Sequence, residues 1–307
     1  MTPPIHSSFT ARVAPALFVL LWSTGFVVAK YAMPYAPPLG FLVLRFAFAC
    51  AVLTPLIMLA RAPWPNLQVT GHLIVSGVLV HCAYLSGVWC AVKLGMPASL
   101  VALIVNMQPI ATALLLGMLG EPVSRRQWFG LALGLAGVMV VFSNKLSILM
   151  GAATAGAAQV SVAGLLLSIM ALAGITGGSL YQKRFVPTFD LRSGTLIQYL
   201  AGVVLLAPLW LLLESEPFVW NASLWIAMLW SVLALSIVAI FLMFYLIRTG
   251  SAESVASLFY LVPPGTALMA WFLFDESWGW REALGLFMTA VAVAIVAKNA
   301  TPPAARH

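Results

Sequence analysis

The sequence predicts an all-α polytopic membrane protein, with ten transmembrane helices built as two inverted five-helix repeats. Of the 307 residues, 63% are hydrophobic and only 7% are charged, whereas soluble proteins carry about 25% charged residues. The apolar residues form runs long enough to span a bilayer, and continuous runs of this kind span it as helices. The second half of the chain also repeats the first. Because each half holds five expected spans, the second copy must enter the bilayer from the opposite side.

The internal repeat aligns residues 93–144 with residues 248–299 without a gap. This register pairs Lys93 with Arg248, Gly95 with Gly250, Ser99 with Ser254, Pro109 with Pro264, Glu121 with Glu276, Arg126 with Arg281, Gly130 with Gly285 and Asn144 with Asn299. A second register, shifted by two residues, pairs Lys30 with Lys183, Pro34 with Pro187 and Pro55 with Pro208. We therefore expect a first repeat at 1–145, a linker at 146–159 and a second, inverted repeat at 160–307.

The ten helices are expected where apolar runs are bounded by turn-forming residues. The first run follows Arg12 and has no small-residue cleavage site after it, so we expect a retained helix and not a signal peptide. Proline and glycine clusters separate later runs, at 34–38, 63–66, 95–97, 187 and 217. The expected helices lie near 13–30, 39–60, 69–92, 97–119, 127–143, 160–181, 193–213, 223–247, 252–274 and 281–297.

Basic residues are divided unequally between the two ends of the expected helices. The end that holds the N-terminus carries Arg12, Arg61, Arg125, Arg126, Lys183, Arg184, Arg192, Arg248, Lys298 and Arg306. The other end carries Lys30, Arg45, Lys93, Lys145 and Arg281. Since Lys and Arg are in excess on the cytoplasmic side of membrane proteins, we expect both termini in the cytoplasm. The net charge of +7 does not indicate a nucleic-acid partner, because the basic residues form no stripe.

Polar side chains inside the apolar runs are the candidates for a substrate site. Each is costly in hydrocarbon unless it is paired or faces water. His81 and Tyr84 lie three residues apart, hence on one face of their helix, and Ser257 and Tyr260 repeat this spacing. Rings and neutral hydrogen-bonding groups together suit a small solute with apolar and polar parts. The candidate substrate-binding residues are Trp22, Arg45, His81, Tyr84, Asn106, Ser257 and Tyr260.

Each candidate also has a purely structural interpretation. His81 can be a neutral histidine bonded to a helix backbone or to Tyr84, and both tyrosines can be core rings. Asn106 and Ser257 can hold neighbouring helices together. Arg45 can extend to the membrane surface or pair with a substrate carboxylate. The residues alone leave these alternatives open.

Two prolines are candidates for hinge or gating residues. Pro109 and Pro264 lie near the middle of their expected helices and are equivalent in the repeat. A proline inside a helix removes one backbone hydrogen bond and kinks the helix. Kinked helices at matching places in two halves point to the site of a transporter, although membrane helices also tolerate proline without such a role.

The chain lacks the sequence motifs of several other kinds of chemistry. There is no GxxxxGK[ST] nucleotide loop and no HExxH metal motif. Cys50, Cys82 and Cys90 are odd in number and lack metal-ligand spacing, so no disulfide framework, metal or cofactor is expected. We do not expect an enzyme. The alternative is a membrane-embedded enzyme acting on lipid, with Ser179 as nucleophile and His81 as base.

Two sets of residues resemble the EamA-type members of the drug/metabolite transporter superfamily. One is Trp22-Ser23-Thr24-Gly25 in the first helix, whose second-half equivalent, Thr176-Gly177-Gly178-Ser179, lacks the tryptophan. The other is Pro109, Glu121 and Gly130, repeated as Pro264, Glu276 and Gly285. The resemblance covers nearly the whole chain. It implies an inner-membrane carrier, commonly an exporter of amino acids or other metabolites, with a central cavity lined by both halves.

The function expected on this basis is secondary transport by alternating access. The many rings resemble the aromatic and neutral amino-acid exporters of the family, and drugs or nucleotide sugars are the alternative substrates. Arg45 is the one obvious intramembrane cation for binding an anion, and His81 is the candidate for proton coupling. The expected partners are a small-molecule substrate and the lipid bilayer. A dimer is compatible with the sequence, but a monomer is sufficient.

Overall fold

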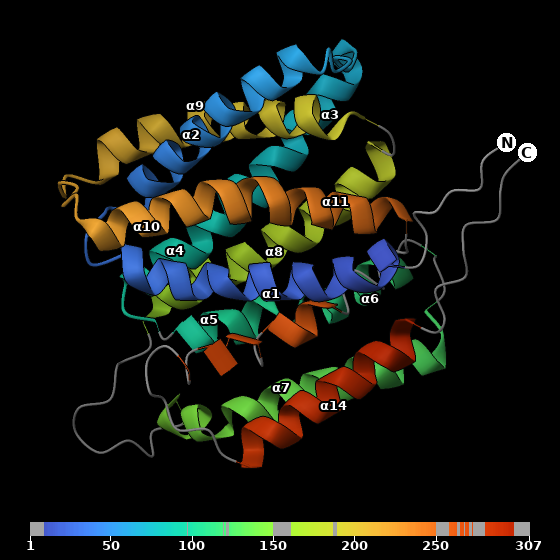
Figure 1. Ribbon diagram of the computed structural model, residues 1–307. Coiled ribbons are helices and arrows are strands. Elements are labelled where there is room, and N and C mark those ends of the chain that lie inside the picture. The colour runs from blue at the N-terminus through green and yellow to red at the C-terminus, as the bar shows by residue number, and fades with distance from the viewer. Residues whose placement is uncertain are drawn as a thin grey trace, which may run out of the picture.

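The computed structural model describes residues 9–96, 98–118, 120, 123–149, 161–186, 189–249, 258–262, 265–266, 268–269, 272 and 280–297. Within these ranges every regular element is a helix (Figure 1). The all-α prediction is therefore confirmed for this part of the chain. The number of ten spans stays a prediction, because most of the expected helix 252–274 lies outside the described residues.

The described helices divide between the two halves of the chain. The first half contains α1 (Phe9–Ala32), α2 (Pro38–Leu59), α3 (Leu67–Gly77), η1 (Val78–Tyr84), α4 (Leu85–Lys93), α5 (Ala98–Val105), α6 (Gln108–Met118) and α7 (Arg125–Leu149). The second half contains α8 (Val162–Phe185), α9 (Leu191–Leu213), α10 (Ala222–Trp230), η2 (Ser231–Ala239), α11 (Ile240–Thr249), η3 (Phe259–Leu261) and α14 (Trp280–Ala297).

Five of these spans are long and apolar enough to cross a membrane. They are Pro38–Leu59, Leu67–Lys93, Val162–Phe185, Leu191–Leu213 and Ala222–Met243. Their outer faces are apolar as well: Leu59 is 84% exposed, Leu212 80% and Ile226 68%. Soluble proteins rarely expose large contiguous apolar surfaces, whereas lipid solvates such a surface.

Side-chain caps explain where several helices begin. Asn66, Ser161, Asp190 and Asn221 each precede a helix, and each accepts a hydrogen bond from a backbone N–H two or three residues later. The first four N–H groups of a helix have no partner within it, so a capping oxygen stabilises the start. These short polar residues place the helix starts within two residues of the expected positions for α3, α8, α9 and α10.

The helices pack as a bundle, with their long axes roughly aligned (Figure 1). Helices α7 and α14 lie together at one edge, where Gly137 leaves space for the backbone of Gly285 and for Thr289. Helices α2 and α9 lie together at the opposite edge, where Gly202 leaves space for the Phe46 ring. The helices α1, α4, α8, α10 and α11 fill the space between these two pairs.

One expected helix is split in the structure. The sequence predicts a single helix at 97–119, but α5 ends at Val105 and α6 begins at Gln108. Pro109 is the cause, because it has no N–H to donate to the carbonyl of Val105 four residues earlier. It sits in the first turn of α6, where the missing N–H costs least.

Two other expected helices are continuous but contain a π-helical segment. The span 67–93 passes through η1, and the span 222–249 passes through η2. In a π-helix the backbone bonds reach one residue further than in an α-helix, so the helix is wider and its side-chain period changes. No sequence signal predicts this.

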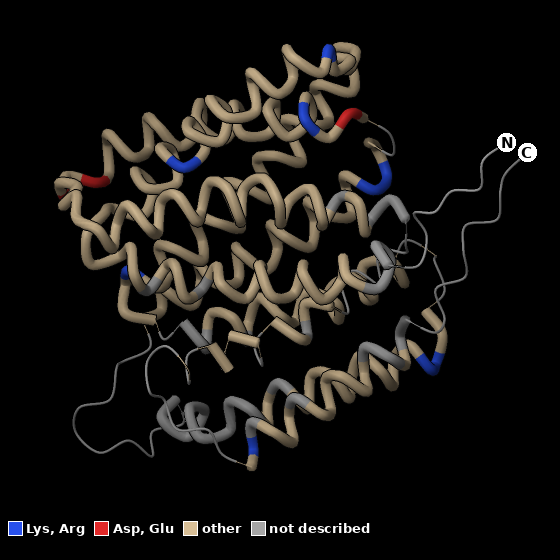
Figure 2. The backbone as a smooth tube through the Cα atoms, in the orientation of Figure 1, with Lys and Arg blue, Asp and Glu red and all other residues tan. Residues whose placement is uncertain are grey.

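Charged residues gather at the two ends of the bundle (Figure 2). Arg61 follows α2, Lys183 and Arg184 end α8, and Arg192 begins α9, all at the end where α1 starts. Lys93 ends α4 at the opposite end. Arg45 lies inside α2, seven residues after its first residue, and is buried, whereas the charged residues named above lie at helix ends.

Candidate functional site

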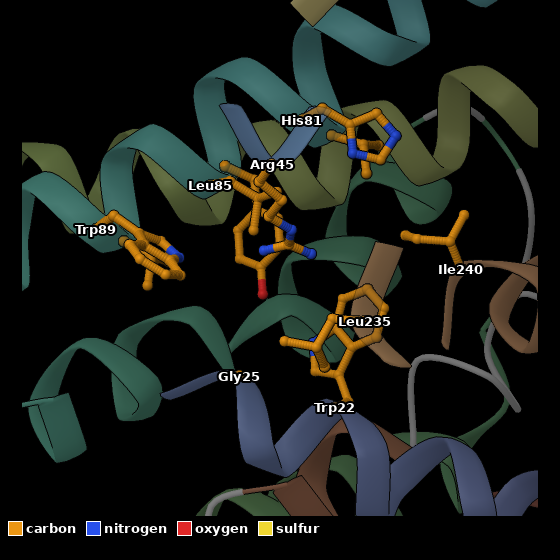
Figure 3. A pocket seen from close by; sticks show the side chains of 11 residues that line it. Trp22, Gly25, Arg45, His81, Leu85, Trp89, Leu235 and Ile240 are labelled. Atoms are coloured by element: carbon orange, nitrogen blue, oxygen red, sulfur yellow. The ribbon is translucent and has the colours of Figure 1, made fainter. Parts of the chain in front are cut away.

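A cavity lies between α1, α2, the η1–α4 span and the η2–α11 span (Figure 3). Its lining comes from both halves of the chain. The lining residues are Trp22, Gly25, Arg45, Val80, His81, Tyr84, Leu85, Val88, Trp89, Leu235 and Ile240. Four of the seven candidate substrate-binding residues, Trp22, Arg45, His81 and Tyr84, are therefore brought together in one place.

Arg45 is the charged residue of this cavity. Its side chain is only 5% exposed, and its Nε donates a hydrogen bond of 2.7 Å to Ser236 Oγ on η2. Figure 3 shows the guanidinium group reaching into the space above Trp22 and Leu235. Among the described residues, no carboxylate forms an ion pair with Arg45. Arg45 thus does not extend to the membrane surface but crosses to the other half of the protein.

Aromatic rings form much of the cavity wall. Trp22 and Tyr84 are nearly parallel, with ring centroids 6.4 Å apart, and Trp22 meets Phe259 edge-on at 5.3 Å. Trp89 stacks on Phe41 at 4.6 Å. Rings held by other rings keep their orientation, so these walls are rigid apolar surfaces on which a planar or aliphatic group can pack.

His81 lies on the side of the cavity near α9. Its ring contacts Phe46 at 5.7 Å and Tyr199 at 4.7 Å between centroids. Its side chain interacts with the neighbouring Gln198, although neither His81 Nε2 nor Gln198 Oε1 forms a hydrogen bond of regular geometry among the described residues. Gln198 instead donates through Nε2 to Ser76 and Gln182. Neither of the structural bonds considered for His81, to a helix backbone or to Tyr84, is present.

The π-helical segments η1 and η2 both face the cavity. Val80, His81 and Tyr84 belong to η1, and Leu235 belongs to η2. Helix α8 approaches η1 closely because it has no Cβ at Gly174 and Gly178. A Cβ at Gly174 would lie 2.7 Å from the carbonyl oxygen of Leu79 and 2.8 Å from the backbone nitrogen of Tyr84. The widened helix and its glycine-lined neighbour together position the polar residues of η1.

Three further candidates are placed elsewhere or only in part. Asn106 is buried between α5 and α6, where its Nδ2 donates to the carbonyl of Ala102, and it does not line this cavity. Pro109 starts α6 and is buried. The backbone of Tyr260 belongs to η3, and its side chain is outside the description. Ser257 and Pro264 lie outside the described residues.

Sequence reasoning missed seven residues of the cavity lining and the serine that bonds Arg45: Gly25, Val80, Leu85, Val88, Trp89, Leu235, Ile240 and Ser236. One signal was available, because Leu85, Val88 and Trp89 continue the helical face of His81 at spacings of four, seven and eight. The residues of η2 had no such signal. They are apolar or small, like most residues of a membrane helix.

One end of the cavity region is closed by polar contacts between the two halves. Lys93, at the end of α4, forms an ion pair with Glu216 and donates to the carbonyl of Met33 at 3.3 Å. The carboxylate of Glu214 accepts the backbone N–H groups of Leu39 and Gly40, each at 3.0 Å, at the start of α2. The bonds of Glu216 and Glu214 link the connection after α9 to α4 and α2 of the first half.

Metal binding and hydrolytic chemistry have little support in the described part of the chain. No group of three or more His, Cys, Asp or Glu side chains lies close enough to hold a metal ion there. The hydroxyl of Ser179 donates to the carbonyl of Ile175 in its own helix at 2.7 Å. The described cavity therefore has rigid, mostly apolar walls and one cationic side chain. The hydroxyl of Ser179 is not paired with a base among the described residues.

Comparison with known proteins identifies this architecture. The family model for the EamA-like transporter family matches residues 13–143 and again residues 161–298. The chain belongs to the EamA-like transporter family. It is accordingly a multi-pass membrane protein of the drug/metabolite transporter superfamily, and the family points to a transporter and away from an enzyme.

Individual relatives of this EamA-type transporter are also named as transporters or efflux pumps. The chain is 25% identical over 291 residues to the uncharacterized inner membrane transporter YedA of Escherichia coli K12, covering 94% of this chain and 92% of YedA. It is 27% identical over 171 residues to a probable amino-acid metabolite efflux pump of Salmonella typhimurium. That match covers 55% of this chain and about half, 52%, of the pump. A crystal structure of a protein with 23% identity has the same fold, with a TM-score of 0.74 over 96% of this chain and 98% of that one.

Proposed function

We propose that this transporter is an alternating-access carrier that exports small amphipathic metabolites bearing a carboxylate across the inner membrane. Aromatic and other neutral amino acids are the first class to test. The observation that carries the proposal is the cavity between the two halves, in which a buried guanidinium group faces rigid aromatic walls. The name of the Salmonella relative, an amino-acid metabolite efflux pump, agrees with this substrate class and with export.

The directions of the helices support the inverted repeat that alternating access requires. Helix α1 runs from right to left in Figure 1, and α8 runs from left to right. The pairs α2 with α9 and α7 with α14 also run in opposite directions. As a result, the chain positions of Lys93 and Arg248, which are equivalent in the repeat, lie at opposite ends of the bundle. We infer repeats at 1–145 and 160–307 around a site near the middle of the membrane.

Contacts between the halves are the elements that would open and close. At one end the Lys93–Glu216 ion pair joins α4 to the connection after α9. At the other end Ser193 on α9 donates to the carbonyl of Pro63 at 2.8 Å. Breaking one set while keeping the other would expose the cavity to one side of the membrane at a time. Pro109, at the split between α5 and α6, is the proposed hinge, with Pro264 as its equivalent on sequence grounds.

The proposed roles follow the chemistry of the lining. Trp22 and Tyr84 pack against the apolar part of the solute, Arg45 binds its carboxylate, and His81 offers a neutral hydrogen-bonding group. Tyr260, Asn106 and Ser257 complete the proposal on sequence grounds, for a conformation in which their helices face the cavity. The excess of Lys and Arg at the end that holds the start of α1 supports cytoplasmic termini.

Counterflow measures this function directly. Proteoliposomes loaded with unlabelled Phe, Thr or Met are diluted into the same amino acid in radiolabelled form. A carrier accumulates label transiently and saturably, whereas a passive channel shows no counterflow. Flux equal to that of protein-free vesicles for each of these amino acids excludes amino acids as the substrate class. Repeating the assay with an imposed pH gradient shows whether the carrier is coupled to protons.

A further inference from the structure

Among the described residues that line the cavity, Arg45 is positively charged and none is negatively charged. Within the described part of the chain, Arg45 is also without an ion-pair partner. We infer that the preferred substrate is an amphipathic anion of net charge −1, whose carboxylate or sulfonate pairs with Arg45, and that a zwitterion of the same size binds more weakly. This inference deepens the proposed function and rests on it.

The first reason is the charge and the hydrogen bonding of the Arg45 guanidinium group. An arginine side chain stays protonated in proteins and has five N–H donors, of which the structure uses Nε for Ser236. A buried charge is stable only when it is paired or hydrogen-bonded. The two terminal nitrogens point into the cavity, so they are placed to bind a carboxylate through two parallel hydrogen bonds. The bond to Ser236 holds the guanidinium plane in this orientation.

The second reason is that the described lining has no negatively charged side chain to pair with an ammonium group. In an amino-acid zwitterion the ammonium group lies two bonds from the carboxylate carbon, so binding the carboxylate at Arg45 brings a second positive charge close to the first. The repulsion is strong because the cavity wall is apolar. The lining offers the ammonium group only ring faces, a tyrosine hydroxyl and an imidazole. These groups lower the free-energy cost of placing an ammonium group near Arg45 but do not neutralise its positive charge. A monoanion has no ammonium group, so its binding carries no such cost.

The third reason is the apolar surface of the cavity walls. The cavity walls are mainly apolar side chains with a few polar groups, which is the usual composition of a small-molecule site. Trp22, Trp89, Leu85 and Ile240 present apolar surface around the guanidinium group. A single-ring or short aliphatic body attached to one acidic group matches this arrangement. Metabolites of amino acids that have lost or blocked the amino group belong to this class.

A charge series with one constant phenylethyl group tests the inference on the full-length purified protein. The ligands are 3-phenylpropionate (net −1), 2-phenylethanesulfonate (−1), phenylalanine (zwitterion), 3-phenylpropanamide (neutral) and phenethylamine (+1). Equilibrium dialysis in detergent at pH 7 measures binding without the leak of weak acids through a membrane. We expect both anions to bind at least about tenfold more tightly than phenylalanine, which is the effect of one well-placed charged hydrogen bond, and the amine to bind most weakly.

Variants of Arg45 test whether this residue causes the preference for anions. Arg45→Gln is expected to remove the advantage of the anions, and Arg45→Lys is expected to keep part of it. Lys183→Gln makes the same change of charge at an exposed helix end and is expected to leave the series unchanged. Size-exclusion profiles report whether each variant is folded. If Arg45→Gln does not fold, the wild-type series alone decides the sign of the preferred charge.

The outcomes separate this inference from the proposed function. Phenylalanine that binds as tightly as 3-phenylpropionate, together with counterflow of phenylalanine, overturns the anion preference and leaves the carrier standing. Anion preference that survives Arg45→Gln in a folded protein overturns the assignment to Arg45. Absence of binding by all five compounds together with absence of counterflow contradicts the proposed function itself.

Discussion

The two π-helical segments have equivalent positions in the repeat but different side chains. The shift of 155 residues that pairs Lys93 with Arg248 also pairs His81 in η1 with Ser236 in η2, and Val80 and Leu85 with Leu235 and Ile240. All but Ser236 of these six residues line the cavity, and Ser236 bonds Arg45. The two halves therefore bring the same positions to the same place, which is what a duplicated scaffold does.

The chemistry at these positions is not duplicated. The second register, a shift of 153 residues, pairs Arg45 on α2 with Gln198 on α9, and Phe46 with Tyr199, whose rings stack at 5.2 Å. Arg45 is bonded to Ser236, whereas the equivalent pair, Gln198 and His81, leaves two buried atoms without a hydrogen bond of regular geometry in the described structure. Equivalent positions of the two family domains thus carry different side chains, and Arg45 places the charge on one side of the cavity, where we infer that an anion binds.

The largest effect is expected where α8 packs against η1. Gly174→Val places side-chain atoms against the backbone of Leu79 and Tyr84, so we expect a loss of about 3 kcal/mol in the free energy of unfolding. Thermal unfolding in detergent measures it. Gly177→Val is the matched control, since a Cβ there meets nothing within 4 Å. Equal loss in both variants means that close packing does not position η1.

The second effect tests the bond between Arg45 and η2. Ser236→Ala leaves a buried charged donor without its acceptor, so we expect a loss of about 1–3 kcal/mol in unfolding free energy. We also expect weaker binding of 3-phenylpropionate. Ser231→Ala is the control on the same segment, because the Ser231 hydroxyl is buried with no hydrogen-bond partner and its removal breaks no bond. If the two variants are equally stable, the Arg45–Ser236 bond is not a significant contact.

The third effect concerns the equivalent residue in the other half. His81→Phe replaces the imidazole with a somewhat larger apolar ring and removes an Nε2 that forms no hydrogen bond of regular geometry among the described residues. We therefore expect the unfolding free energy to change by less than about 1 kcal/mol, in contrast to Ser236→Ala. Counterflow with and without a pH gradient is measured on the same variant. Loss of the pH response alone identifies His81 as the coupling group, and a large loss of stability shows that His81 has a structural bond.

The smallest effect lies outside the membrane, at the start of α9. The side chain of Arg192 donates two hydrogen bonds to Asp190, and these lower the pKa of the Asp190 carboxyl from its usual value. Because the folded-state pKa is lowered, the ion pair stabilises the protein above the unfolded-state pKa of about 3.9, and its contribution disappears as the pH falls through the folded-state pKa.

Thermal unfolding between pH 6 and pH 3 checks this. We expect the wild type to lose more stability on acidification than Asp190→Asn, by at most about 1 kcal/mol, because the pair is partly exposed. The asparagine variant keeps an oxygen for the helix cap, so the difference reports the charge and not the cap. Identical pH profiles mean that the pair contributes nothing measurable.

Much of the site could be predicted from single residues. Trp22, Arg45, His81 and Tyr84 are recognisable because a ring with a polar atom, or a charge, is unusual inside an apolar run. Leu235 and Ile240 are not, because nearly every position of a membrane helix is apolar whether it faces lipid, a neighbouring helix or a cavity. Glycines such as Gly174 and Gly178 are also frequent in membrane helices, so their spacing does not reveal which backbone they approach.

The sequence by itself indicated that this protein is solvated by lipid and where most of its helices lie, because hydrophobicity and turn-forming residues act on their own stretch of chain. Only the tertiary structure decided that Arg45 bonds a serine 191 residues away and faces a cavity, and that the helices widen at η1 and η2. Such contacts depend on which helix faces are adjacent in three dimensions, and residues in contact can lie anywhere in the chain.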